Sequence, residues 1–167
     1  REDLTATLAE RLAAGLVDAA ILAFPYDLPG IDFIEIADDP FWFACAPDHP
    51  LADQKSVSRG DVSGCELLLL EDGHCLREHA IDACELRDRY AAASFGGTSL
   101  FTLAQMTKAG LGATLLPEMA VRDGLAKSAG LTAIPFANPA PVRNIGVAWR
   151  RGSGRKEEAL AMAAELK

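Results

Sequence analysis

Two cysteines in one short stretch are the residues best suited to chemistry in this sequence. Cys75 follows a run of four leucines at residues 67–70 and a turn signal at Asp72-Gly73. The apolar run predicts a buried strand, and the residues after Gly73 have the spacing of a helix. Cys75 is therefore predicted to begin a helix, where free backbone N–H groups and the helix dipole favour a thiolate. The thiolate is the reactive form, so Cys75 is a candidate reactive thiol.

The second cysteine, Cys84, is predicted near the end of the same helix, nine residues after Cys75. An intact helix would separate the two residues by roughly 13 Å along its axis. A disulfide needs Cα atoms about 4.4–6.8 Å apart, so the pair could bond only if the helix unwound. Two other interpretations stay open. Both thiols could be buried structural residues, or they could join His74 and His79 in a metal site that lacks common zinc-ligand spacing.

The composition favours a globular protein without a nucleic-acid-binding surface of its own. The chain has 167 residues, 50% of them hydrophobic, with a net charge of −8 and a pI near 4.8. An acidic chain of this kind does not present the basic surface that DNA requires. Four cysteines are too few for a secreted disulfide framework, and no apolar run is long enough to cross a bilayer, so a cytoplasmic location is predicted. Cys45 and Cys65 are predicted to be structural.

Predicted strands alternate with predicted helices along the chain. Leucines at every fourth position from Leu4 to Leu16 predict an amphipathic helix that ends at Gly15. Later helices are predicted at residues 58–62, 75–84, 99–109, 118–123 and 155–167. The predicted strands are 17–24, 33–37, 41–46, 67–70, 92–95, 112–116, 131–136 and 144–150. This alternation predicts an α/β fold with a mostly parallel sheet, and the loops expected at 38–40 and 141–144 suggest two subdomains.

Several segments together carry a resemblance to a known family. Residues 70–77, Leu-Glu-Asp-Gly-His-Cys-Leu-Arg, with the second cysteine nine residues after the first, resemble the redox-sensing segment of hydrogen-peroxide-responsive LysR-type transcriptional regulators. Residues 15–21, 39–52 and 109–117 also resemble segments of the LysR-type regulatory domain, in the same order. The resemblance covers nearly the whole chain.

This resemblance implies two Rossmann-like subdomains of the LysR substrate-binding type, which is similar to periplasmic binding proteins. Residues 1–38 and 145–167 would form regulatory subdomain I, which we expect to be incomplete at its N-terminus. Residues 39–144 would form subdomain II, which carries the redox cysteines. The winged helix-turn-helix of the family is not found in this sequence, so DNA would be bound only through that preceding domain.

The resemblance also implies a mechanism and a set of site residues. Hydrogen peroxide would oxidise Cys75, and Cys84 would then form an intramolecular disulfide with it, which switches conformation and dimer arrangement. Other family positions fall on residues that would support the peroxide pocket or the thiolate: Thr5, His74 and Arg143. A further pair, Thr98 and Ser99, matches the helix start where other LysR-type domains contact their effectors.

The implied protein is a transcriptional regulator of oxidative-stress genes, oxidised stoichiometrically, rather than an enzyme. We expect a homodimer or homotetramer, a thioredoxin or glutaredoxin system as reductant, and no cofactor, metal or membrane partner. Three alternatives stay open: a LysR-type domain that binds a small metabolite without redox chemistry, a thiol peroxidase, and a solute-binding protein.

Overall fold

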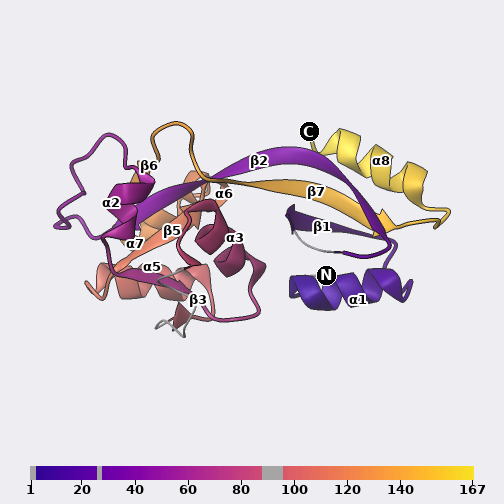
Figure 1. Ribbon diagram of the computed structural model, residues 1–167, viewed down its shortest axis with the longest axis horizontal. Helices are drawn as coiled ribbons and strands as arrows, with labels where there is room; N and C mark the ends of the chain where they lie inside the picture. The colour runs from indigo at the N-terminus through magenta and orange to yellow at the C-terminus, as the bar shows by residue number, and fades with distance from the viewer. Residues whose placement is uncertain (1–2, 26–27, 88–95) are drawn as a thin grey trace. The chain divides into compact units, whose positions relative to one another are not determined.

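The computed structural model describes residues 3–25, 28–87 and 96–167 (Figure 1). Its helices and strands form an α/β fold, as the sequence predicts. The backbone divides into two compact units: unit 1 is residues 1–38, 73–75 and 143–167, and unit 2 is residues 39–72 and 76–142. The assignment of regulatory subdomains to residues 1–38 with 145–167 and to 39–144 stays a prediction.

Unit 1 holds a small antiparallel sheet between two helices. Its elements are α1 (Thr5–Ala13), β1 (Ala19–Phe24), the first part of β2 (Ile31–Cys45), β7 (Val142–Arg150) and α8 (Lys156–Glu165). Strand β1 pairs antiparallel with β7. Successive side chains of a strand point to opposite faces, so Ala148 packs in the cluster of α1 while Val147 and Trp149 pack against α8. The two helices therefore cover opposite faces of this sheet.

Unit 2 contains the rest of β2 and most of the remaining elements. These are α2 (Arg59–Ser63), β3 (Leu67–Leu70), α3 (Cys75–Ala83), β4 (Gly96–Gly97), α5 (Leu100–Lys108), β5 (Ala113–Pro117), α6 (Glu118–Arg122), α7 (Leu125–Ala129) and β6 (Thr132–Pro135). Strand β2 pairs with both β5 and β6, and β3 lies between β5 and β4.

The four leucines of β3 explain why this segment has no polar alternation. Leu67 and Leu69 enter the main core cluster with α3, whereas Leu68 and Leu70 pack with Leu103 of α5. All four side chains are buried, because helices cover both faces of the strand. The predicted buried strand is confirmed, and it ends one short turn before Cys75.

The loops predicted at 38–40 and 141–144 are wrong, because these segments belong to strands, although the boundaries between the two units fall within them. Residues 38–40 lie inside the fifteen-residue strand β2, and residues 142–144 begin β7. Proline has no N–H for a sheet ladder, but Pro40 precedes the positions where β2 pairs with β5 and β6, which begin at Phe41 and Trp42. Pro40 therefore interrupts neither of these pairings, and the strand continues.

The sheet is also less parallel than predicted. Strands β3–β4 and β3–β5 pair in parallel, but β1–β7, β2–β5 and β2–β6 are antiparallel. Helix α7 was not predicted from the sequence; left-handed glycines, Gly124 and Gly130, bound it at both ends. The strand predicted at 92–95 lies outside the described residues.

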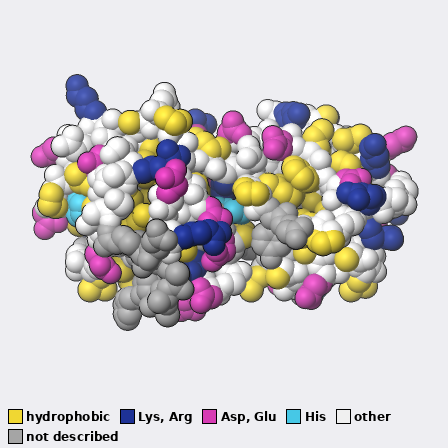
Figure 2. Space-filling view, viewed as in Figure 1, with side chains coloured by type: hydrophobic (Ala, Val, Ile, Leu, Met, Phe, Trp, Pro, Cys, Tyr) yellow, Lys and Arg dark blue, Asp and Glu magenta, His cyan; other side chains and the backbone are white. Residues whose placement is uncertain are grey.

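Charged side chains on the face drawn in Figure 2 do not separate by sign. On the face drawn in Figure 2, acidic and basic groups are interspersed, and the described residues form no extended basic area there. With the net charge of −8, this face offers little complementarity to DNA phosphates. Among the residues that the structure describes, no helix has both the length and the hydropathy needed to span a membrane.

Candidate functional site

The turn between β3 and α3 positions Cys75, and Gly73 with Arg77 shapes it. Gly73 has a φ of +96°, a conformation that residues with a Cβ rarely adopt. Arg77 is buried, its Nη1 donates to the carbonyl of Leu70 at 3.4 Å, and its Nε forms an ion pair with Asp72 at 2.9 Å. In the structure its charge ties the end of β3 to the start of the helix.

Cys75 and Cys84 lie at the two ends of α3, as predicted. Cys75 is the first residue of the helix and is half-buried, and Cys84 directly follows the last helical residue. Both thiols are free. Nine residues of helix separate them by roughly 13 Å along the axis, so a direct bond requires the helix to open.

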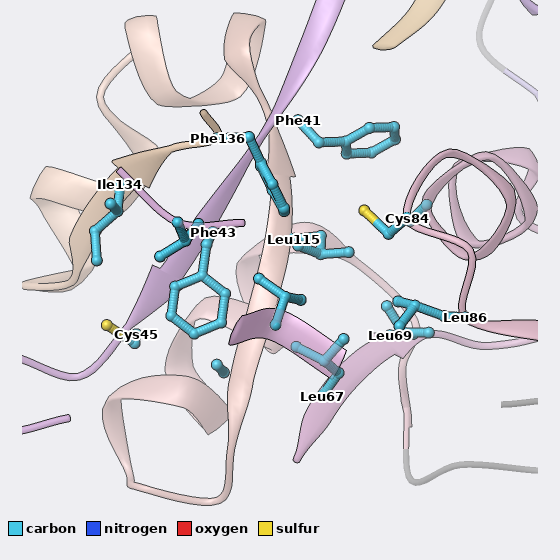
Figure 3. Close-up of a cluster of buried hydrophobic side chains, with 14 of the residues drawn as sticks. Phe41, Phe43, Cys45, Leu67, Leu69, Cys84, Leu86, Leu115, Ile134 and Phe136 are labelled. Atoms are coloured by element: carbon cyan, nitrogen blue, oxygen red, sulfur yellow. The ribbon is translucent and has the colours of Figure 1, made fainter. Parts of the chain in front are cut away.

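Cys84 is held inside the hydrophobic core of unit 2. Figure 3 shows its side chain beside the cluster that includes Phe41, Leu69, Leu86 and Leu115, and only 2% of its surface is exposed. Burial raises the pKa of the Cys84 thiol to about 12, and nearby Arg59 opposes this shift. In this state Cys84 is a protonated, sheltered thiol, whereas Cys75 is partly accessible to solvent.

The predicted supporting residues fall at defined places in the fold. Thr5 is the buried first residue of α1, His74 is half-buried before α3, and Arg143 is half-buried near the start of β7. These three residues and Cys75 belong to unit 1, and Cys84 belongs to unit 2. Their roles toward peroxide stay predictions.

The predicted effector-contact pair lies at the start of α5. Ser99 is the N-cap: its Oγ accepts a hydrogen bond from the Thr102 N–H at 3.1 Å. Thr98 precedes it, and both side chains are exposed. Their proposed contact with an effector stays a prediction, because capping alone accounts for a serine at this position.

His79 is buried one turn after Cys75. Residues four apart lie on the same face of a helix, so His79 and Cys75 share a face of α3. Among the described residues, no group of three or more His, Cys, Asp or Glu side chains is placed to hold a metal ion.

Cys45 and Cys65 occupy different environments. Cys45 ends β2, is fully buried, and has its pKa raised to about 11, first by burial and then by Cys65 and Asp48. Cys65 follows α2, is partly exposed, and its thiol lies 3.4 Å from the carbonyl oxygen of Asp61. Their predicted structural roles stay predictions.

Sequence reasoning missed two residues that shape the end of α3, Arg59 of α2 and Glu85. Arg59 donates from Nε to the carbonyl of Ala83 at 2.9 Å, across 24 positions of sequence. Glu85 has a φ of +58° and is the one non-glycine residue with positive φ among those described. Neither feature has a local sequence signal, because a Glu or an Arg is common on any surface.

Alkaline pH is expected to lower the free energy of unfolding through the buried thiols of Cys84 and Cys45. Each has a folded pKa above the ordinary value of 9.0, about 12 for Cys84 and about 11 for Cys45. Below pH 9 the two thiols are protonated in the folded and the unfolded chain alike, so their contribution to stability is fully present. Above pH 9 the unfolded chain loses protons that the folded chain retains, so stability falls until the pH passes the folded pKa.

The free energy of unfolding is expected to fall by up to about 1.4 kcal/mol per pH unit for each thiol. Urea unfolding across the range from pH 9 to about 11 measures it. The variants Cys84→Ala and Cys45→Ala should each flatten the slope relative to the wild-type chain, since other titrating groups are common to all three. Equal slopes in all three proteins would contradict the assignment.

The sequence of this chain matches a known protein family over its whole length. The family model for the LysR substrate binding domain matches residues 1–167. A probable hydrogen peroxide-inducible genes activator of Streptomyces viridosporus is 37% identical over 167 residues, which cover 99% of this chain and 54% of that protein. The DNA-binding transcriptional dual regulator OxyR of Escherichia coli (strain K12) is 38% identical over 152 residues, 91% of this chain and 50% of that protein.

A solved structure shares the same fold. A mutant Corynebacterium glutamicum OxyR with H2O2 bound superimposes with a TM-score of 0.84 at 32% identity, covering 99% of this chain and 56% of that one. The chain spans about half the length of the curated relatives it matches.

Proposed function

The chain belongs to the LysR substrate binding domain family, and from this premise we propose that it is the peroxide-sensing regulatory domain of a LysR-type transcriptional regulator. The observation that carries the proposal is the pair of free thiols at opposite ends of α3. One is partly accessible at the helix start, and the other is buried directly after the helix end. Relatives named for peroxide-inducible gene activation support the same role.

The proposed chemistry oxidises two thiols with one hydrogen peroxide. The Cys75 thiolate attacks one peroxide oxygen, the O–O bond breaks, and the departing hydroxide takes up a proton to become water, leaving a sulfenic acid. The Cys84 sulfur then attacks the Cys75 sulfur, the S–O bond breaks, and a second water leaves. The product is an intramolecular disulfide, and each protein sulfur has lost one electron.

The buried position of Cys84 gives this sequence of steps an order. A protonated thiol in the core is a poor nucleophile, so Cys75 is oxidised first. The disulfide then requires α3 to open, which replaces one local structure by another. Thr5, His74 and Arg143 are proposed to hold the peroxide and stabilise the leaving hydroxide, because such a step needs hydrogen-bond donors and positive charge nearby.

The partners of the whole protein are part of the proposal. We expect DNA binding through a separate domain of a longer chain, a homodimer or homotetramer, and reduction by a thioredoxin or glutaredoxin system. Thr98 and Ser99 remain a proposed effector contact at the start of α5.

Peptide mapping by mass spectrometry tests the proposal directly. Reduced protein is treated with one equivalent of hydrogen peroxide, alkylated and digested, and a Cys75–Cys84 cross-link is expected that a dithiol reductant reverses. A protein without redox chemistry, such as a metabolite-binding domain, would keep both thiols alkylated. A thiol peroxidase would instead consume many equivalents of peroxide per chain when supplied with thioredoxin.

A further inference from the structure

The end of α3 is closed by a Schellman motif with Glu85 at its left-handed position. The Leu86 N–H donates to the Ile81 carbonyl at 2.8 Å, and the Glu85 N–H donates to the Asp82 carbonyl at 3.1 Å. This position usually holds glycine, because a Cβ at positive φ is disfavoured by roughly a factor of ten. Glu85 is therefore a strained residue, and it directly precedes Leu86, whose side chain is buried in the core.

Arg59, which lies on a different helix, hydrogen-bonds to this end of α3. It is the first residue of α2, whose start is fixed by a capping box between Ser58 and Asp61. Its guanidinium donates through Nε to the Ala83 carbonyl at 2.9 Å, and through Nη1 to the Pro139 carbonyl at 3.4 Å. The Ala83 carbonyl is one of the last four of the helix, which have no partner within it.

The contacts of Arg59 lie next to the backbone that has to move when Cys84 leaves its place. Ala83 directly precedes Cys84, and the Cys84 N–H itself donates to the Ala80 carbonyl at 3.1 Å. Moving the Cys84 sulfur toward Cys75 requires the backbone at Cys84 to shift, and the adjacent Ala83 carbonyl that accepts from Arg59 is expected to shift with it. Through the same position next to Ala83, the charge of Arg59 also counteracts the burial that raises the Cys84 pKa.

We propose that Arg59 is a positioning residue that clamps the end of α3 and so sets how readily Cys84 leaves the core to attack an oxidised Cys75. This inference rests on the proposed function for its consequence, but the clamp itself is a property of the reduced protein. Arg59 makes and breaks no covalent bond. It stabilises the closed end of the helix, and the left-handed Glu85 acts in the opposite direction.

Stopping the reaction at intervals separates the two oxidation steps. Dimedone traps the sulfenic acid at Cys75, and mass spectrometry counts the disulfide. The variant Arg59→Met removes the charged donor and keeps much of the side-chain volume. It is expected to speed disulfide formation about fivefold to tenfold and to leave sulfenic acid formation unchanged, since a hydrogen bond from a charged, half-buried group is lost.

A lysine variant distinguishes the effect of the Arg59 hydrogen bonds from the effect of its positive charge. Arg59→Lys keeps the positive charge but lacks the planar group that reaches two carbonyls at once. If Arg59 acts as a clamp, Arg59→Lys should speed disulfide formation nearly as much as Arg59→Met. A lysine variant with the wild-type rate would overturn the proposal in favour of a purely electrostatic role.

Glu85 offers a matched change in the other direction. Glu85→Gly relieves the left-handed strain and is expected to slow disulfide formation by roughly a factor of five to ten. Glu85→Gln removes the same charge without relieving strain, and should stay within about twofold of the wild-type rate. If Glu85→Gly and Glu85→Gln behaved alike, the strain part of the argument would be wrong.

Hydrogen exchange of the reduced protein tests the clamp without any peroxide present. The amides of Cys84, Glu85 and Leu86 should exchange about fivefold to tenfold faster in Arg59→Met than in wild type. Unchanged exchange, or an unchanged rate of disulfide formation where wild type forms one, overturns the clamp. If wild type forms no disulfide with peroxide, the proposed function fails, and faster exchange in Arg59→Met still supports the clamp.

Discussion

Replacing Cys75 by serine is expected to abolish disulfide formation and the response to hydrogen peroxide. A serine hydroxyl is not oxidised in this way, and Cys84, the other thiol of the proposed pair, is too well sheltered to react in its place. Cys84 is only 2% exposed, and burial raises its pKa to about 12, so its thiol stays protonated at neutral pH. Mass spectrometry after one equivalent of peroxide should find Cys84 still reduced in Cys75→Ser.

Two further substitutions serve as controls for this experiment. Cys84→Ser should still form a sulfenic acid at Cys75 that dimedone traps, but it should form no intramolecular disulfide and should proceed to the sulfinic acid in excess peroxide. Cys65→Ser removes another partly exposed thiol and should respond as wild type does. A Cys75→Ser protein that still oxidises at low peroxide would refute the assignment of Cys75 as the sensing thiol.

Residues whose environment is set locally could be predicted from the sequence. The four leucines of β3 form an apolar run too short for a helix and covered on both faces, so their burial was expected. The turn at Gly73 and the helical spacing after it also placed Cys75 at a helix start. The thiol chemistry of this position follows from these local features and from the resemblance.

Features set by contacts between distant segments could not be predicted in this way. Pro40 indicated a break, but the pairings of β2 with β5 and β6 begin only after it, so the strand continues. Arg59 reaches Ala83 across 24 positions, and a sequence read in windows shows no such contact. The depth at which Cys84 is buried also depends on Phe41 and Leu115, which lie on strands β2 and β5.

Opening of α3 on oxidation is expected to have the largest structural effect of any change considered for this chain. In the reduced protein the Cys84 N–H donates to Ala80 and the Leu86 N–H donates to Ile81, at 3.1 and 2.8 Å. A disulfide between Cys75 and Cys84 brings their Cα atoms within about 7 Å, which an intact helix does not allow. These amides should then exchange with solvent at least tenfold faster in the disulfide form.

The energies of the two forms should be close enough for a reversible switch. A disulfide that closes so short a loop stabilises the chain by about 2–3 kcal/mol in the chain-entropy model. Opening the helix exposes apolar side chains such as Ile81 and Leu86, at roughly 1.5–3 kcal/mol each when they were fully buried. The disulfide gains about as much as it costs to expose one such side chain fully, so a modest change in redox conditions can select either form.

Hydrogen exchange of both forms across residues 75–87 measures this opening, with two segments as internal references. Peptides from β3 and from α8 should keep their protection, because neither strand nor helix has to unwind for the sulfurs to meet. Loss of protection confined to α3 and its cap would show that oxidation acts on the helix that carries both thiols. Equal protection of α3 in the reduced and fully disulfide-bonded proteins would contradict the switch even with the disulfide present.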